Sequence, residues 1–167
     1  NSIYGEVFKV PEPLINKVGA RIYGLSTPGD KMSKSQPDGC VFLMDSPDDV
    51  RRKFKRAVTD SDRENCVRYD KEAKPGVANL MNIYSTLTGK TIPEIEAEFA
   101  GQGYGVFKPA VGETVVEALR PIREEAERLM RDKAYLDEVY RKGAEAASYV
   151  ANKTLRKVYR KVGFYQL

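Results

Sequence analysis

The chain has no histidine and only two cysteines, Cys40 and Cys66. Without histidine it has no histidine base, no Ser-His or Cys-His nucleophile pair and no histidine metal ligand. The cysteines lie far apart in the sequence, so a tetrahedral Cys/His zinc site cannot form and a disulfide framework is not expected. We therefore predict no metal site, reduced thiols and a cytoplasmic location.

Long apolar runs are also missing. The longest cover a few residues, such as Val41–Met44, whereas a membrane-spanning helix needs about 20. No charged-then-apolar signal segment opens the chain, and no membrane association is expected. With 41% hydrophobic and 31% charged residues the composition is that of a globular protein. The net charge of +4 is only a weak sign of a polyanionic partner.

The local patterns predict a mainly α-helical chain. Gly, Pro, β-branched and aromatic residues dominate the first 45 positions, where two short strands are expected at residues 20–25 and 40–44. Ser46 and Pro47 begin a helix, with acids in its first turn. Further helices are expected at residues 75–87, ended by Gly89, and at residues 92–99, capped by Thr91. A Gly-rich linker at residues 101–105 separates these from two long helices at residues 112–131 and 135–162. We interpret the apolar stripes of the last two as core, and their short linker predicts antiparallel packing.

The pentapeptide Lys31–Ser35 reads Lys-Met-Ser-Lys-Ser. Gly and Pro on both flanks predict a surface loop. Two lysines three residues apart can close on a polyphosphate, and the serine hydroxyls and backbone amides can orient it. Taken alone, the segment could also be an ordinary solvated Lys/Ser loop.

This pentapeptide resembles the KMSKS signature of class I aminoacyl-tRNA synthetases. The resemblance extends over residues 17–22, 57–61, 68–76, 79–87 and 103–108. Together these blocks resemble the carboxy-terminal half of the bacterial tryptophanyl-tRNA synthetases, and the later blocks separate that family from its tyrosyl relative. Gln36 follows the pentapeptide where the family would have Asp, so we assign this side chain no role.

The resemblance implies a fold. Residues 1–45 would be the carboxy-terminal tail of a Rossmann-like α/β catalytic domain carrying the KMSKS loop, and residues 46–167 an antiparallel helical bundle of the anticodon-binding type. The family also needs a histidine-bearing ATP signature and an amino-acid pocket, and the first cannot occur here. We therefore expect a fragment that is inactive alone and monomeric, whereas the intact enzyme would be a homodimer.

The resemblance also implies a reaction. The intact enzyme would use ATP with Mg²⁺ to activate tryptophan as tryptophanyl-adenylate and would transfer it to tRNA(Trp), whereas the fragment would bind no cofactor tightly. Lys31 and Lys34 would be catalytic, neutralising the developing pyrophosphate. ATP would contact Ile22, Lys31, Met32, Ser33, Lys34 and Ser35.

Two basic patches are candidates for RNA contact. The positions that we predict to bind tRNA are Arg52, Arg56, Lys153, Arg156 and Arg160. Tyr69, Tyr84, Tyr149 and Tyr159 are available to stack on bases. The plainer interpretation is a solvated helix face, partly favoured by the helix dipole. The alternative function is a stand-alone basic helical module that binds RNA and catalyses nothing.

Overall fold

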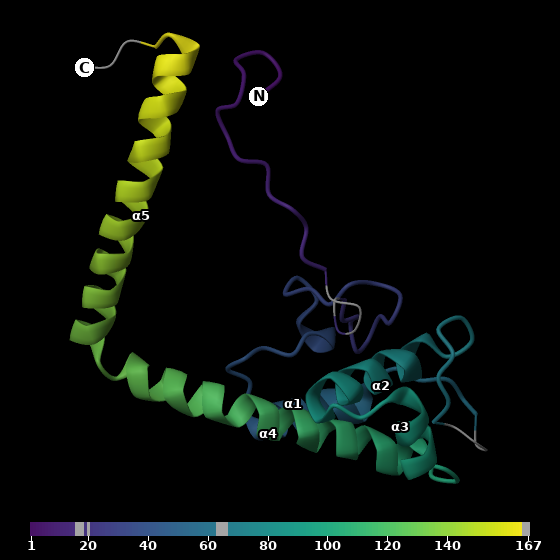
Figure 1. Ribbon diagram of the computed structural model, residues 1–167. Coiled ribbons are helices and arrows are strands. Elements are labelled where there is room, and N and C mark those ends of the chain that lie inside the picture. Colours follow the sequence, from purple (N-terminus) through teal and green to yellow (C-terminus); the bar gives the residue numbers. More distant parts are fainter. Residues whose placement is uncertain (16–18, 20, 63–66, 165–167) are drawn as a thin grey trace. The chain divides into compact units, whose positions relative to one another are not determined.

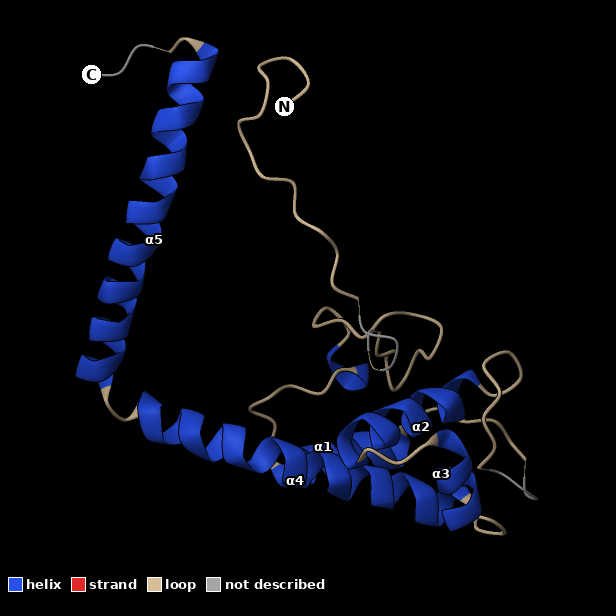
Figure 2. Cartoon of the chain, in the orientation of Figure 1, coloured by secondary structure: helices blue, strands red, loops and turns tan. Residues whose placement is uncertain are grey.

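A computed structural model describes residues 1–15, 19, 21–62 and 67–164, and within these ranges the regular structure is entirely helical (Figure 2). The elements are the 3₁₀-helix η1 (Pro37–Gly39) and the α-helices α1 (Pro47–Arg56), α2 (Pro75–Thr88), α3 (Ile92–Glu98), α4 (Tyr104–Met130) and α5 (Lys133–Val162). The chain forms two compact units, Ile15–Glu125 and a unit of Asn1–Leu14 with Ala126–Leu167. The predicted boundary near residue 45 stays a prediction.

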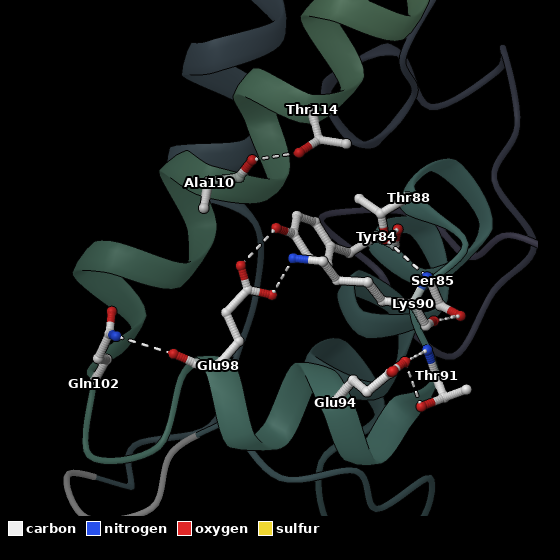
Figure 3. Close-up of polar contacts among 10 residues, drawn as sticks. All are labelled: Tyr84, Ser85, Thr88, Lys90, Thr91, Glu94, Glu98, Gln102, Ala110 and Thr114. Carbon is white, nitrogen blue, oxygen red and sulfur yellow. Dashed lines mark hydrogen bonds and ion pairs between the residues drawn. The ribbon is translucent and has the colours of Figure 1, made fainter.

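Short local signals define several helix ends. The Ser46 hydroxyl accepts a hydrogen bond from the Asp49 amide at 3.1 Å and caps α1. Thr91 and Glu94 form a capping box at the start of α3, and Figure 3 shows the Thr91 amide and hydroxyl both donating to the Glu94 carboxylate. Gly89, at φ 74°, ends α2 in the left-handed conformation. These three boundaries confirm the sequence predictions.

Helix α4 begins at Tyr104, well before the predicted start at residue 112. The glycines at 101, 103 and 105 led us to predict a linker. Phe107 is fully buried, and its ring meets that of Phe99 edge to face at 5.0 Å. Burial of an aromatic side chain of this size outweighs the low helix propensity of the neighbouring glycines.

The unit Ile15–Glu125 has one hydrophobic core, around which α1, α2, α3 and the amino-terminal part of α4 gather (Figure 1). The fully buried large side chains are Val50, Phe54, Val77, Leu80, Met81, Ile95, Phe107 and Val111. Leu25, from the segment before α1, joins this core at 2% exposure. The pentapeptide's own flank therefore packs on the helices.

Gly76 lies closer to a neighbouring segment than the other glycines do. A Cβ atom at this position would lie 2.1 Å from the Val58 carbonyl oxygen, so only glycine fits where α2 meets the end of α1.

Helix α5 corrects one prediction. Its apolar stripe was expected to be core, yet none of its residues is buried, and Val139, Val150 and Leu155 are 44%, 64% and 42% exposed. The stripe on α4 is buried at Val115 and Val116 but exposed at Ile122. Periodicity reports which residues share a face and says nothing of what covers that face. Antiparallel packing of α4 and α5 stays a prediction.

The two predicted short strands are also corrected. In the part of the chain that the structure describes, the β pairing is a single antiparallel bridge between Tyr23 and Lys31. Leu43 and Met44 lie in a turn, which the Asp45 amide closes by donating to the Phe42 carbonyl at 3.1 Å. Residue 20 lies outside the described residues. A strand needs a neighbour over several residues, and these segments have at most one bridge.

A buried lysine joins the starts of α2 and α4 to the loop after α1. Lys74 is 2% exposed, and its ammonium group lies 3.0 Å from Asp60, 2.6 Å from Asp62 and 3.2 Å from the Tyr104 hydroxyl. Tyr104 donates to the other Asp60 oxygen at 2.6 Å. Burial alone would lower the pKa of Lys74, but these partners outweigh burial and raise it. Burial alone would raise the pKa of Asp60, but hydrogen bonds from Tyr104, the Asp62 amide and Lys74 lower it.

Tyr104→Phe should reduce the free energy of unfolding of the intact protein by about 1–3 kcal/mol at pH 7, because Asp60 and Lys74 each lose a partner. The folded-state pKa of Asp60 is depressed, so its stabilisation is present above the unfolded pKa of about 3.9 and disappears as pH falls through the folded value. The difference between wild type and variant should therefore shrink below about pH 4. Urea denaturation across pH measures it.

Tyr69→Phe is the matched control, because the Tyr69 hydroxyl donates to the neutral amide of Asn82 at 3.2 Å. Its effect on unfolding should not change with pH. Equal pH dependence for both variants would contradict the role given to Asp60.

Candidate functional site

The KMSKS loop, Lys31–Ser35, begins in the second arm of a tight hairpin. Tyr23 bridges to Lys31, and the flanking pairs are hydrogen-bonded at 2.9 Å, from the Met32 amide to the Ile22 carbonyl and from the Gly24 amide to the Asp30 carbonyl. Because these hydrogen bonds join the two arms on either side of the bridge, they fix the backbone of Lys31, where the loop begins.

Helical elements hold the base of this hairpin. The Leu25 amide donates to the Gly39 carbonyl in η1 at 2.9 Å, and the Leu25 carbonyl accepts from the Val58 amide, just after α1, at 2.7 Å. The Asn79 side chain in α2 bonds the Tyr23 backbone twice, at 3.0 and 2.9 Å. The loop therefore stands on a base that is continuous with the helical core.

The loop tip is exposed. Lys31, Ser33, Lys34 and Ser35 are all solvent-exposed, whereas Met32 is half-buried against the core. The Gln36 amide donates to the Ser33 carbonyl at 3.0 Å, which closes a turn. Neither lysine is ion-paired with any carboxylate in the described ranges. Two unneutralised cations on a tight turn are suited to binding phosphate.

The predicted ATP-binding residues lie together on this hairpin. Ile22 is half-buried, packs against the core and uses its carbonyl to hold Met32. The described residues contain no group of three or more potential His, Cys, Asp or Glu metal ligands. No helix in those ranges is long and apolar enough to cross a membrane.

The sequence alone did not identify two of the residues that shape the loop. Gln36, to which we assigned no role, accepts a hydrogen bond from the Thr27 hydroxyl at 3.0 Å and ties the end of the loop to the hairpin turn. Asn79 is 3% exposed. Its only signal in the sequence is an amide among apolar residues of a helix, because a buried amide must find hydrogen-bond partners.

A groove of about 1050 Å³ lies between the hairpin and α2. It is lined by the cations Arg21, Lys71 and Lys90, the rings of Tyr23 and Tyr69, and the amides Asn79 and Asn82.

The basic patch on α1 is weaker than the sequence suggests. Arg51 pairs with Asp48 and Glu113, Arg52 with Asp49, and Lys53 with Asp45. Asp48 and Asp49 lie in the first turn of α1, Asp45 precedes the helix and Glu113 comes from α4, so counting only the cations of the helix missed these partners. Arg56 is exposed, and Arg52 remains half-exposed beside its partner.

The patch on α5 stays solvent-facing. Lys153, Arg156, Lys157, Arg160 and Lys161 are all exposed. The Arg160 guanidinium donates to the Arg156 carbonyl at 3.4 Å, which keeps the two residues on one side of the helix.

One aromatic candidate is ruled out as a base-stacking surface. Tyr84 is 7% exposed, and Figure 3 shows the Glu98 carboxylate between the Tyr84 hydroxyl, at 3.3 Å, and the Lys90 ammonium, at 2.8 Å. Burial and the neighbouring Glu98 raise the pKa of Tyr84. Tyr149 is 74% exposed, and Tyr159 packs its ring edge to face against Phe164.

Comparison with known proteins yields consistent relatives. The chain is 51% identical to tryptophan–tRNA ligase of Clostridium tetani over 98% of its own length and 48% of the relative. It is 48% identical to the same ligase of Wolinella succinogenes, over 98% of this chain and 49% of the relative. The chain thus spans about half the length of these curated relatives.

Solved structures agree. Tryptophanyl-tRNA synthetase from Mycoplasma pneumoniae matches 90% of this chain and 45% of its own, with a TM-score of 0.74 and 28% identity. The enzyme from Campylobacter jejuni, solved with ADP and tryptophan, matches 98% of this chain and 50% of its own, with a TM-score of 0.69 and 28% identity. A family model described as class I tRNA synthetases (W and Y) matches residues 1–120. The chain therefore belongs to the tryptophan and tyrosine group of the class I tRNA synthetases.

Proposed function

We propose that this chain is part of a cytoplasmic tryptophan–tRNA ligase, to which it contributes the KMSKS loop and a tRNA-binding helical surface. The observation that carries the proposal is the exposed lysine pair on a hairpin braced by the helices. In the intact enzyme, the tryptophan carboxylate attacks the α-phosphorus of ATP, forming a C–O–P link and releasing pyrophosphate. A terminal ribose hydroxyl of tRNA(Trp) then takes the tryptophanyl group and AMP leaves.

Neither step needs a protein nucleophile, so the protein acts by positioning and by stabilising charge. Lys31 and Lys34 neutralise negative charge as it develops on the leaving pyrophosphate. Serine hydroxyls and backbone amides of the loop orient the phosphates, and Ile22 and Met32 border the adenine. The ATP phosphates would bring Mg²⁺ with them, because phosphate oxygens are hard ligands of the kind that this ion prefers.

Two alternatives are less well supported. A stand-alone RNA-binding module does not explain why relatives that match 98% of the chain are ligases about twice as long. A tyrosyl enzyme fits the family model, but the relatives at 46–51% identity are all named for tryptophan. The proposed partners are therefore tRNA(Trp), ATP and tryptophan, with a homodimer as the form of the intact enzyme.

For the tRNA, we propose phosphate contacts from exposed cations at Arg52, Arg56, Lys153, Arg156 and Arg160. The α5 stripe supports this more strongly than the α1 patch, because acids already neutralise much of the latter. Such contacts give affinity and orientation but read no sequence.

Lys31→Ala and Lys34→Ala, each made in the intact enzyme, should lower the rate of adenylate formation about 100- to 1000-fold while tryptophan binding changes little. The lysines meet charge that develops in the transition state, so their loss affects mainly the rate constant. Single-turnover kinetics measures it. Lys142→Ala is the matched control, an exposed lysine of α5 paired with Glu138, and should react like wild type. Near-normal activation by both loop variants would contradict the proposal.

Replacing Arg156 and Arg160 together with Ala should weaken tRNA binding and flatten the slope of log affinity against log salt by up to about two units. Each neutralised phosphate releases counterions, so a lost contact reduces the slope by about 0.7–0.9. Arg141→Ala with Lys142→Ala removes the same charge from the same helix, at positions paired with Glu145 and Glu138, and should leave the slope unchanged. Equal slopes for all three proteins would place the stripe off the RNA.

A further inference from the structure

Asn79 completes the open edge of the hairpin that carries the KMSKS loop. Tyr23 and Lys31 face each other in the bridge, and the printed bonds between the arms come from their neighbours, Met32 to Ile22 and Gly24 to Asp30. In such a pair the central residue's own N–H and C=O point away from its partner, toward the outer edge. At that edge the Tyr23 amide donates to Asn79 Oδ1 at 3.0 Å, and Asn79 Nδ2 donates to the Tyr23 carbonyl at 2.9 Å.

One side chain therefore takes the place of a neighbouring strand. Asn79 is 3% exposed, and α2 holds it rigidly, because Val77, Leu80 and Met81 around it are fully or almost fully buried. Both ends of its amide are used on Tyr23. Few other side chains can donate and accept at once with this geometry.

The connection to the loop is short. Asn79 fixes the backbone of Tyr23, and Tyr23 is the residue paired with Lys31, the first residue of the loop. No described ion pair holds the Lys31 side chain, so the backbone of Lys31 sets the point from which this flexible side chain reaches the phosphates. A shift of about 1 Å in a positioning group can cost about 100-fold in rate.

We propose that Asn79 is a positioning residue for amino-acid activation, which places Lys31 by pinning Tyr23 to helix α2. Both ends of the Asn79 amide are used on Tyr23, so it acts on activation through the hairpin. The inference rests on the proposed function, because it requires Lys31 to act on the ATP phosphates.

The test uses Asn79→Leu in the intact enzyme, which keeps the number and branching of the side-chain heavy atoms and removes both hydrogen bonds. Asn82→Leu is the matched control. It makes the same change one turn along α2, but Asn82 accepts from the Tyr69 hydroxyl and does not bond any described residue of the hairpin. Single-turnover adenylate formation is measured over an ATP series, with tryptophan affinity measured separately.

Asn79→Leu should slow activation about 10- to 100-fold and raise the ATP requirement, with tryptophan affinity within about twofold of wild type. Asn82→Leu should leave all three unchanged. In a Lys31→Ala background, Asn79→Leu should add little, because the group that it positions is gone. This non-additivity separates positioning from a general structural effect, for which the two losses would multiply.

Normal activation in a folded Asn79→Leu protein would overturn the inference, and so would fully multiplicative losses. Should that variant not fold, Asn79→Ser is measured in the same way. Failure of both to fold would overturn the inference too, since Asn79 would then serve the stability of the whole core. Normal activation by Lys31→Ala would instead refute the proposed function, whatever Asn79 does.

Discussion

The backbone of Leu25 is the point on which the arrangement of this protein depends. Its side chain is in the helical core, its amide bonds to Gly39, and its carbonyl bonds to Val58. One residue thus joins the hairpin, η1 and the end of α1. A buried backbone N–H or C=O must be hydrogen-bonded, so burial of Leu25 in the core requires both of its backbone bonds. The close approach at Gly76 places Val58 where it can make its bond.

This arrangement gives the loop a fixed base and an exposed tip. The base shares the core of α1 to α4, and the tip holds two lysines that no described acid neutralises. A catalyst that works on phosphates by charge alone benefits from both features, because the cations must be accessible and their backbone must be held in a fixed position. The buried Lys74 cluster adds a second connection, between the loop after α1 and the starts of α2 and α4.

Much of this could be predicted from local sequence. Ser46, Thr91 and Gly89 defined helix ends because capping chemistry is local, and the KMSKS string identified the loop. The predictions that depended on contacts with residues elsewhere in the fold were wrong. The start of α4 depended on the burial of Phe107, and the predicted strands depended on a neighbouring strand to pair with. The net charge of the α1 patch depended on Glu113, which comes from another helix. The apolar stripe of α5 was identified correctly as a stripe, but its exposure could not be inferred from spacing. Asn79 and Gln36 were missed for the same reason, since their roles lie in contacts across the fold.

The most direct test of this account is amide hydrogen exchange in the intact protein, compared residue by residue around the hairpin. The amides of Tyr23, Leu25 and Val58 should be protected to the level of the α2 interior, because each donates to a partner fixed by the helical core. The amide of Lys34, at the exposed tip, should exchange rapidly. Exchange at Leu25 and Val58 as fast as that at Lys34 would show that the helices do not hold the base of the loop.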